Sequence, residues 1–197
     1  MKELYINFTN LLKTPLKDFL SGFKKVVDET AEESGKNVSF KVEGDDIFIS
    51  QDEQNLLNDS LIHLVRNSVD HGIEGSETRV KENKNETGNI IISVKKNSNG
   101  YGINIKDDGA GIDSDLVTKK AIENGIVSRD EVQNMSEGEK LKLIFKAGLS
   151  TKEEVSELSG RGVGMDVVST NIEKLGGEID ISTEKGVGTQ FSISIKG

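Results

Sequence analysis

Apolar residues at helical spacing predict two helices in the first part of the chain. Within the N-terminal segment 1–35, apolar side chains recur every three or four positions over residues 11–34, with charged residues between them, which is typical of an amphipathic helix. Pro15 falls in its first turn, where a missing amide N–H does no harm, and Gly35 ends it. A second helix is predicted over residues 52–71, with its apolar residues on one stripe. Residues three, four and eight positions apart form an adjoining polar stripe, which consists of His63, Asn67, Asp70 and His71.

Alternation of apolar and polar residues predicts three pairs of strands. The first two pairs are each joined by a short polar turn and are expected to form hairpins. The last pair is joined by a turn at residues 186–188, and Thr189 stands at the start of the final strand. In chain order the pairs are residues 38–42 with 47–49, 90–94 with 103–105, and 179–181 with 191–195.

The second half of the chain carries three further helical patterns. Asp113 is expected to cap a helix that Gly125 ends. Residues 128–146 form a longer helical segment, and residues 163–175 form another helix. Small and acidic residues predominate over 147–160, which fits either a lid over a ligand or an ordinary surface loop.

Length and composition restrict the class of protein. The 197 residues, of which 30% are charged and 34% hydrophobic, fit one domain with a substantial core. No apolar run reaches the roughly 20 residues of a membrane-spanning helix, and the Met-Lys-Glu start lacks the shape of a signal peptide. The expected location is therefore the cytoplasm. The absence of cysteine excludes disulfides, thiolate chemistry and cysteine-bound zinc.

The net charge of -9 argues against a general nucleic-acid binder, which needs a basic face to replace phosphate counterions. An acidic chain can still bind a small polyanion through glycine amides, a helix N-terminus and a bound cation. Residues 159–168 suit that task, because Gly160, Gly162 and Gly164 precede a helix and glycine lets backbone amides approach a ligand closely. Taken alone, this loop also fits an ordinary turn.

Two polar clusters suit an adenine nucleotide with magnesium. The polar stripe of the second helix carries the two histidines of the chain and an asparagine, a poor helix former, although polar helix faces are common. Asn67 offers a neutral oxygen to a magnesium ion that bridges phosphates. Asp107 ends a predicted strand beside Gly109 and Gly111, where its carboxylate can accept a hydrogen bond from the exocyclic amine of adenine.

Other ligand sites fit less well. Counting twelve positions from Asp107 reaches Thr118, where a helix-loop-helix calcium site requires a glutamate. The chain has no Gly-Lys-Ser/Thr phosphate loop, and its glycine loop does not follow a strand as a dinucleotide-binding turn does.

In order and spacing, these segments resemble the ATP-binding domain of the bacterial chemotaxis histidine kinase family, in the superfamily of DNA gyrase and the heat-shock chaperone ATPase. The similarity covers about residues 36–195 and rests on five segments. They are residues 63–74, similar to the asparagine box; Asp107, Gly109 and Gly111, similar to the first glycine box; residues 145–151, similar to the phenylalanine box and lid; residues 160–168, similar to the second glycine box; and Gly186, Gly188, Thr189 and Phe191, similar to the closing strand.

The resemblance implies the Bergerat ATP-binding fold, an α/β two-layer sandwich of a mixed, largely antiparallel sheet with helices on one face. A single ATP-binding kinase domain would span residues 1–197, with the ATP lid at about 145–162. Asn67 would coordinate magnesium, with His63 as a second ligand or as the base that prepares the acceptor. Asp107 would bind the adenine amine. Gly111 and Thr189 would contact the nucleotide through water, and Ser150 and Thr151 would belong to the lid. The residues implied at the phosphates are Arg161, Gly162, Val163, Gly164 and Met165. The remaining nucleotide-binding residues implied are Asp70, His71 and Gly109.

The resemblance further implies an ATP- and Mg²⁺-dependent transfer of the γ-phosphoryl group to a histidine on a separate domain or protein. The family's phosphoacceptor, dimerisation and coupling domains have no counterpart in this chain. Autophosphorylation in isolation is therefore not expected, and the chain is expected to be a monomer. Chemotaxis-type coupling and response-regulator proteins are the implied partners. The sequence is compatible both with a domain excised from a longer kinase and with a free-standing protein that acts on a separate acceptor. Two rival functions are a nucleotide-controlled interaction module without transfer and an anti-sigma-type serine/threonine kinase.

Overall fold

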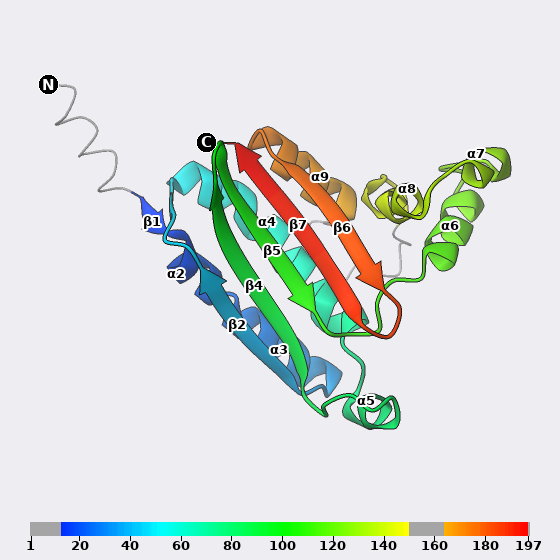
Figure 1. Ribbon diagram of the computed structural model, residues 1–197, viewed down its shortest axis with the longest axis horizontal. Helices are drawn as coiled ribbons and strands as arrows, with labels where there is room; N and C mark the ends of the chain where they lie inside the picture. The colour runs from blue at the N-terminus through cyan, green and yellow to red at the C-terminus, as the bar shows by residue number, and fades with distance from the viewer. Residues whose placement is uncertain (1–12, 150–163, 197) are drawn as a thin grey trace, which may run out of the picture.

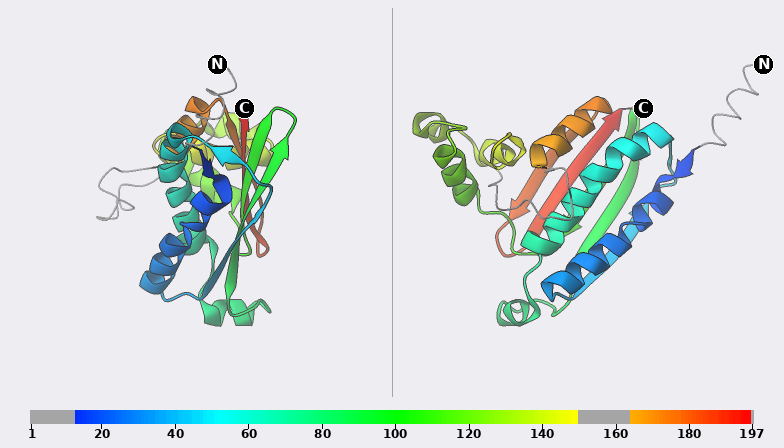
Figure 2. Two further views of the ribbon diagram at one scale, coloured as in Figure 1. Left: turned by 90° about the vertical axis from the view of Figure 1, so that its left-hand side faces the viewer. Right: turned by 180° about the vertical axis from the view of Figure 1, so that it is seen from behind.

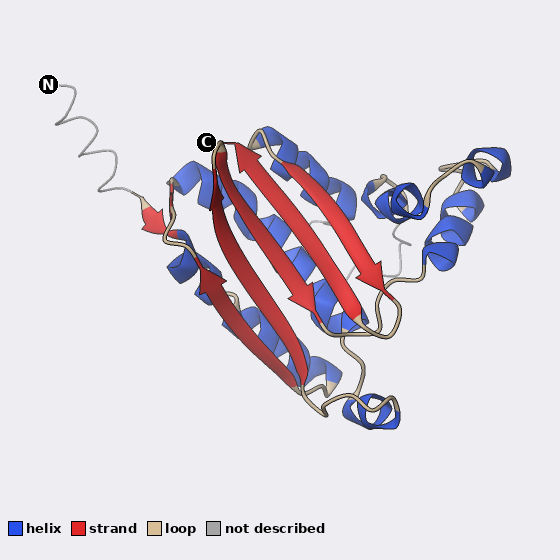
Figure 3. Ribbon diagram, in the orientation of Figure 1, coloured by secondary structure: helices blue, strands red, loops and turns tan. Residues whose placement is uncertain are grey.

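The protein is built from one five-stranded sheet with helices packed on one face (Figure 1). The computed structural model describes residues 13–149 and 164–196. Seen from the side, the helices lie on one side of the sheet, and coloured by type they form a second layer (Figures 2 and 3). The strand order is β2-β4-β5-β7-β6, with bounds Val38–Gly44 for β2, Gly88–Asn97 for β4, Gly100–Asp107 for β5, Gly188–Lys196 for β7 and Glu178–Glu184 for β6.

The sheet is mixed, as expected. β2 runs parallel to β4, and the other three neighbouring pairs are antiparallel. Along β5 and β7 alternate side chains, such as Ile103 and Ile193, are buried against the helices. The predicted α/β two-layer class and the β4–β5 hairpin are therefore confirmed.

The first predicted hairpin is wrong. β2 pairs with β4, in the register Val38 with Gly88, whereas β3 (Phe48–Ile49) pairs antiparallel with β1 (Thr14–Pro15) in a separate two-stranded sheet. Alternation shows that a strand has one buried face, but it does not identify the neighbour. Here the long apolar strand β4 offers β2 a partner within the main sheet.

The N-terminal helix is interrupted. It consists of α2 (Leu16–Ser21) and α3 (Lys24–Ser34), which are separated by a turn at Gly22 and Phe23. The expected start was too early: Thr14–Pro15 form the short strand β1, and the helix begins at Leu16 with Pro15 as the N-cap, so Pro15 precedes the first turn and does not lie within it. Gly35 ends α3 in the left-handed conformation, with φ of 63°, as predicted. The part of the expected helix before residue 13 lies outside the described residues.

The central helix α4 (Gln51–Asn67) begins with a capping box formed by Ser50 and Glu53. It continues as η1 (Ser68–Gly72), a π-helical turn in which the amide of Ile73 donates to the carbonyl of Ser68 over 2.8 Å. The prediction of one α-helix to residue 71 was therefore wrong in its last turn. A π-turn contains an extra residue and changes which side chains face a given side.

The main core lies between the sheet and the helices α4 and α9 (Met165–Lys174), which run side by side (Figure 2). Leu57, Leu61, Leu64 and Val65 of α4 and Val168 and Ile172 of α9 have no exposed surface. This apolar stripe of α4 is the one that the sequence predicts. α5 (Ser76–Lys81) lies apart from this core, at the end of the sheet.

A second, smaller core is formed by the segment between β5 and the glycine loop. Asp113 caps α6 (Ser114–Glu123), as predicted. The expected helix over 128–146 is divided into α7 (Arg129–Gln133), α8 (Glu137–Lys142) and the 3-10 turn η2 (Leu143–Phe145). Separate capping boxes begin α7 and α8, and these local hydrogen bonds compete with a continuous helix.

In the part of the chain that the structure describes, no helix combines the length and the apolar character that a membrane span requires.

Candidate functional site

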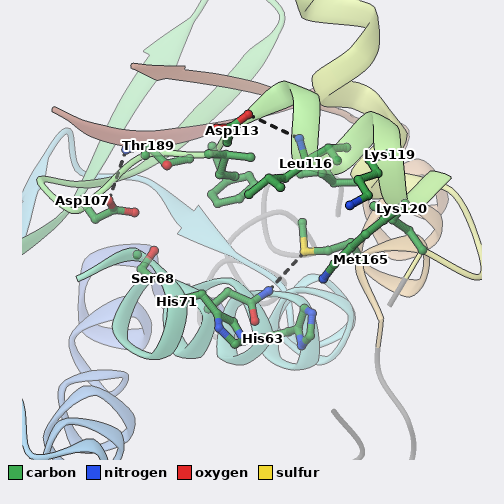
Figure 4. A pocket seen from close by; sticks show the side chains of 18 of the residues that line it. His63, Ser68, His71, Asp107, Asp113, Leu116, Lys119, Lys120, Met165 and Thr189 are labelled. Carbon is green, nitrogen blue, oxygen red and sulfur yellow. Dashed lines mark hydrogen bonds between the residues drawn. The ribbon is translucent and has the colours of Figure 1, made fainter. Parts of the chain in front are cut away.

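A cavity of about 540 Å³ opens between α4 with η1 on one side and α6 on the other. Its floor is formed by residues from the end of β5, from β7 and from the start of α9 (Figure 4). The volume is in the range of sites that bind small organic ligands. The predicted site residues that line it are His63, Asn67, His71, Asp107, Gly111, Met165 and Thr189.

Asp107 is the buried acid of the cavity, with only 2% of its surface exposed. Its Oδ1 accepts hydrogen bonds from the amides of Gly109, at 3.0 Å, and Thr189, at 3.2 Å. Burial raises the pKa of this carboxyl, although these two hydrogen bonds and the Ser68 hydroxyl act to lower it and the charge of Asp108 raises it further. Both backbone donors converge on Oδ1, so that Oδ2 is the oxygen left for a ligand.

Ser68 adds a polar group that the sequence did not single out. It is 2% exposed and lines the cavity, and although its hydroxyl is close enough to Asp107 to lower the pKa of that carboxyl, its Oγ makes no hydrogen bond of ordinary geometry. Figure 4 shows Ser68 next to Asp107. A buried hydroxyl without a partner is unfavourable unless water or a ligand satisfies it. In the sequence Ser68 falls on the apolar stripe of the second helix, where a small side chain gives no signal of a ligand site.

Two glycines bring the backbone around Asp107 into close contact. A Cβ atom on Gly109 would lie 2.0 Å from the carbonyl oxygen of Gly72, so that only glycine lets this loop pack against the end of η1. Gly111 has φ of 75°, and a Cβ there would lie 2.4 Å from the carbonyl oxygen of Glu184. Gly111 lines the cavity, whereas Gly109, also predicted as a nucleotide-binding residue, does not.

The helix edge presents Asn67 between His63 and His71. The Asn67 side-chain nitrogen donates to the sulfur of Met165 over 3.4 Å, which joins α4 to the start of α9. With its nitrogen so engaged, the amide oxygen is the atom available to a cation. Asp70 does not join this edge: it is exposed, and its backbone carbonyl accepts a hydrogen bond from Lys36. The π-turn places His71 on the cavity side instead.

The residues present fit a nucleotide-bound magnesium ion better than an ion held by protein alone. Among residues 13–149 and 164–196, no three His, Asp or Glu side chains are grouped to hold a metal. Mg²⁺ at nucleotide sites usually takes one or two protein ligands and completes its shell with phosphates and water. The Asn67 oxygen, with His63 one turn away on the same wall, fits that requirement.

The opposite wall is formed by α6, and the sequence did not predict it. Leu116, Lys119 and Lys120 line the cavity from this helix, and all three side chains are exposed (Figure 4). The helix itself was predicted, but its position over the cavity depends on the small core beneath it. Exposed lysines on a helix carry no local signal that separates a ligand site from an ordinary surface.

The glycine loop is described only from Gly164 onward. Gly164 is the N-cap of α9 with extended backbone and does not line the cavity, whereas Met165 does. No side chain at the N-cap bonds to the first amides of α9, and the amides at the N-terminus of a helix are groups that an anion can use. Five predicted site residues lie outside the described ranges, namely Ser150, Thr151, Arg161, Gly162 and Val163.

Comparison with known proteins identifies a matching family. Residues 52–197 match the model of the histidine kinase-, DNA gyrase B-, and HSP90-like ATPase family. The chain is 44% identical over 181 residues to the sensor histidine kinase CheAY of Helicobacter pylori, which covers 92% of this chain and 22% of that protein. It is 40% identical to the chemotaxis protein CheA of Halobacterium salinarum, over 92% of this chain and 27% of that protein. The chain thus spans about a quarter of the length of these relatives.

Solved structures support the fold. The catalytic domain of histidine kinase ThkA superimposes with a TM-score of 0.57 at 17% identity, covering 93% of this chain and 94% of that one. The resemblance to the chemotaxis branch and the fold class predicted from the sequence are both confirmed.

Proposed function

The chain belongs to the histidine kinase-, DNA gyrase B-, and HSP90-like ATPase family, and on this premise we propose that the cavity binds ATP with Mg²⁺ for phosphoryl transfer to a histidine on a separate domain or protein. Membership of this family and similarity to chemotaxis kinases support an ATP-binding kinase domain. The observation that carries the proposal is the orientation of Asp107, which lines a cavity of nucleotide size: Oδ1 is held by two amides, and the other carboxylate oxygen points into the open space of the site (Figure 4).

The Asp107 end of the cavity is suited to adenine. An ionised carboxylate accepts a hydrogen bond from the 6-amino group of adenine but repels the carbonyl oxygen that guanine has at that position. The hydroxyls of Ser68 and Thr189 lie beside it and can bind the ring nitrogens through water. Ile112 and Leu116 supply apolar contact for the base.

The Asn67 end is suited to the phosphates. Asn67 and His63 would hold Mg²⁺, which would neutralise phosphate charge and orient the γ-phosphoryl group. Lys119 and Lys120 bring two positive charges from the facing wall, and the first amides of α9 lie next to Met165. Residues 161–163, with Ser150 and Thr151, remain predicted contacts of the same nucleotide.

The reaction breaks the bond between the γ-phosphorus and the β,γ-bridging oxygen and forms a bond from phosphorus to an imidazole nitrogen of the acceptor. ADP leaves with the electron pair, and the acceptor retains phosphohistidine. The chain's contribution is to hold the donor in position and to balance charge, which supply most of the catalysis in such transfers. His63 could take the imidazole proton if it is not a metal ligand.

Calorimetric titration with ATP and GTP, each with and without Mg²⁺, tests the binding step. The proposal requires binding of ATP that Mg²⁺ strengthens and little binding of GTP. Transfer is tested by adding a histidine-containing acceptor domain of a chemotaxis kinase and detecting a phosphoryl group that acid releases and base does not. Binding without such a product would favour the nucleotide-controlled interaction module, and an acid-stable product would favour the serine/threonine kinase. A cytoplasmic monomer working with chemotaxis coupling and response-regulator proteins completes the proposal.

A further inference from the structure

A partly buried cluster of charged side chains surrounds Arg79 next to the loop that follows Asp107, and it takes no part in the proposed binding of ATP. Arg79 is 1% exposed, and its Nη1 donates to Oε2 of Glu74 over 2.8 Å, while its Nη2 lies 3.1 Å from Oδ2 of Asp108. Lys84 Nζ contacts Oε1 of Glu74 at 2.5 Å. Each of these four side chains therefore has an oppositely charged partner, and none of them lines the cavity.

The cluster is attached to the backbone of the loop that follows Asp107. Lys84 Nζ donates to the carbonyl oxygen of Gly109 over 2.7 Å and to that of Asp108 over 3.1 Å. Arg79 Nη1 donates to the same Asp108 carbonyl over 3.2 Å. The loop is thus tied at two successive peptide units directly after the ligand-facing carboxylate.

These ties bear on Asp107 through Gly109. The Gly109 amide is one of the two donors to Oδ1 of Asp107, and Gly109 also packs against the backbone of Gly72. A shift of Gly109 would therefore change both the orientation of the carboxylate and the cavity wall. By contrast, Asp108 is also held independently, because its carboxylate accepts from the backbone and side-chain nitrogens of Asn89 at 2.8 and 2.7 Å.

Stability alone does not account for such a cluster. A buried ion group gains little over well-packed apolar side chains of similar volume, because desolvation offsets most of the Coulomb attraction. Its fixed geometry is what apolar packing would not reproduce, since Arg79 and Lys84 direct donors at particular oxygens. Opposing contacts from Lys84 and Arg79 outweigh burial and keep the pKa of Glu74 below its usual range, which is consistent with an ionised cluster at neutral pH.

We propose that Arg79, Lys84 and Glu74 are positioning residues for base recognition: they fix the Asp108–Gly109 backbone so that Asp107 presents Oδ2 to the adenine amine. This inference rests on the proposed function. It assigns no contact with the nucleotide to the cluster itself. Lys84 provides the most direct link to Gly109, and Arg79 provides the buried fork that joins Glu74 to Asp108.

The first measurement needs no nucleotide. Amide hydrogen exchange of Gly109 and Ala110 is compared in the wild type, Lys84→Met, Lys84→Arg and the control Lys24→Met, which removes a surface ion pair with Asp28 on α3. Exchange at these two amides measures how firmly the loop is held, because the Gly109 amide donates to Asp107 and the Ala110 amide donates to the carbonyl of Gly72. Lys84→Met should speed their exchange, while Lys84→Arg and Lys24→Met should leave it near the wild-type rate.

The second measurement is the affinity for ATP and for inosine triphosphate, which has a carbonyl oxygen in place of the amine. Lys84→Met and Arg79→Met should weaken ATP binding by about 10- to 100-fold, as small misplacements of a recognition group do, and should reduce the preference for ATP over the inosine nucleotide. Circular dichroism and thermal melting identify a variant that is merely unfolded. If Lys84→Met is unfolded at the working temperature, the two affinities are measured for Lys84→Met and Lys84→Arg at a lower temperature, where the variants are folded.

Unchanged exchange in Lys84→Met, or an unchanged preference between the two nucleotides despite faster exchange, would overturn the inference. A wild type that binds neither nucleotide would instead contradict the proposed function, while the exchange experiment would still show whether the cluster holds the loop.

Discussion

The amide of Thr189 donates a hydrogen bond of 3.2 Å to Oδ1 of Asp107, although 82 residues separate the two in sequence. It joins the end of β5 to the start of β7 and, with the Gly109 amide, occupies one carboxylate oxygen. The other oxygen accepts neither of these two bonds, and we propose that it binds the ligand. In the proposed function, recognition of the base would therefore depend on how these two sheet strands meet.

Asp107→Asn should fold and fail to bind ATP. The asparagine oxygen can take the place of Oδ1 and keep both backbone donors, which puts an NH₂ group opposite the adenine amine. Losing a hydrogen bond to a charged acceptor costs about 1.5–3 kcal/mol, and two facing donors add to that. Calorimetry with ATP measures the loss, and thermal melting serves as the control for folding. Wild-type affinity in this variant would show that the cavity is not the adenine site.

The wild type and the Asp107→Asn variant should differ in how their free energy of unfolding depends on pH. Because burial raises the pKa of Asp107 in the folded state, the folded protein binds a proton more tightly than the unfolded chain does. The wild type therefore loses stability as pH rises from the ordinary aspartate pKa through the raised one. Asp107→Asn lacks this titration, so its stability relative to the wild type should increase over that interval. Urea unfolding at several pH values measures the difference, and a constant difference would contradict a raised pKa.

Asn67→Ala should remove the effect of Mg²⁺ on nucleotide binding. The substitution takes away the amide oxygen proposed as ligand, together with the contact to Met165. ATP affinity should then be similar with and without Mg²⁺. Asn55→Ala, at an exposed position of the same helix, is the matched control and should retain the wild-type response. A full Mg²⁺ response in Asn67→Ala would assign the metal to other ligands.

Lys120→Met should weaken binding in proportion to the number of phosphates. An exposed lysine near phosphate oxygens contributes about 1 kcal/mol or less at moderate salt, so that ATP should lose a few-fold in affinity while adenosine loses none. Lys142→Met on α8, whose lysine pairs with Asp180 away from the cavity, is the control. Equal losses for adenosine and ATP would mean that Lys120 shapes the wall and does not attract phosphate.

The sequence alone determined those features that depend on neighbouring residues. The apolar stripe of α4 and the Asp113 cap of α6 were predicted because helix periodicity and capping are local. The β4–β5 hairpin was predicted because its turn is short. Asp107 and Asn67 were chosen from local chemistry and from the order of motifs that resemble a family, and both line the cavity.

Only the tertiary structure decided which segments meet. β2 pairs with β4, not with its neighbour in sequence, because strand alternation specifies a buried face and leaves the partner open. The π-turn brings His71 to the cavity and leaves Asp70 exposed. The cavity wall that contains Lys120 depends on where α6 packs. The hydrogen bond from Lys84 to the carbonyl of Gly109 joins residues 25 positions apart. These contacts form between residues far apart in the chain, so their energy is set by packing and burial, which no short stretch of sequence contains.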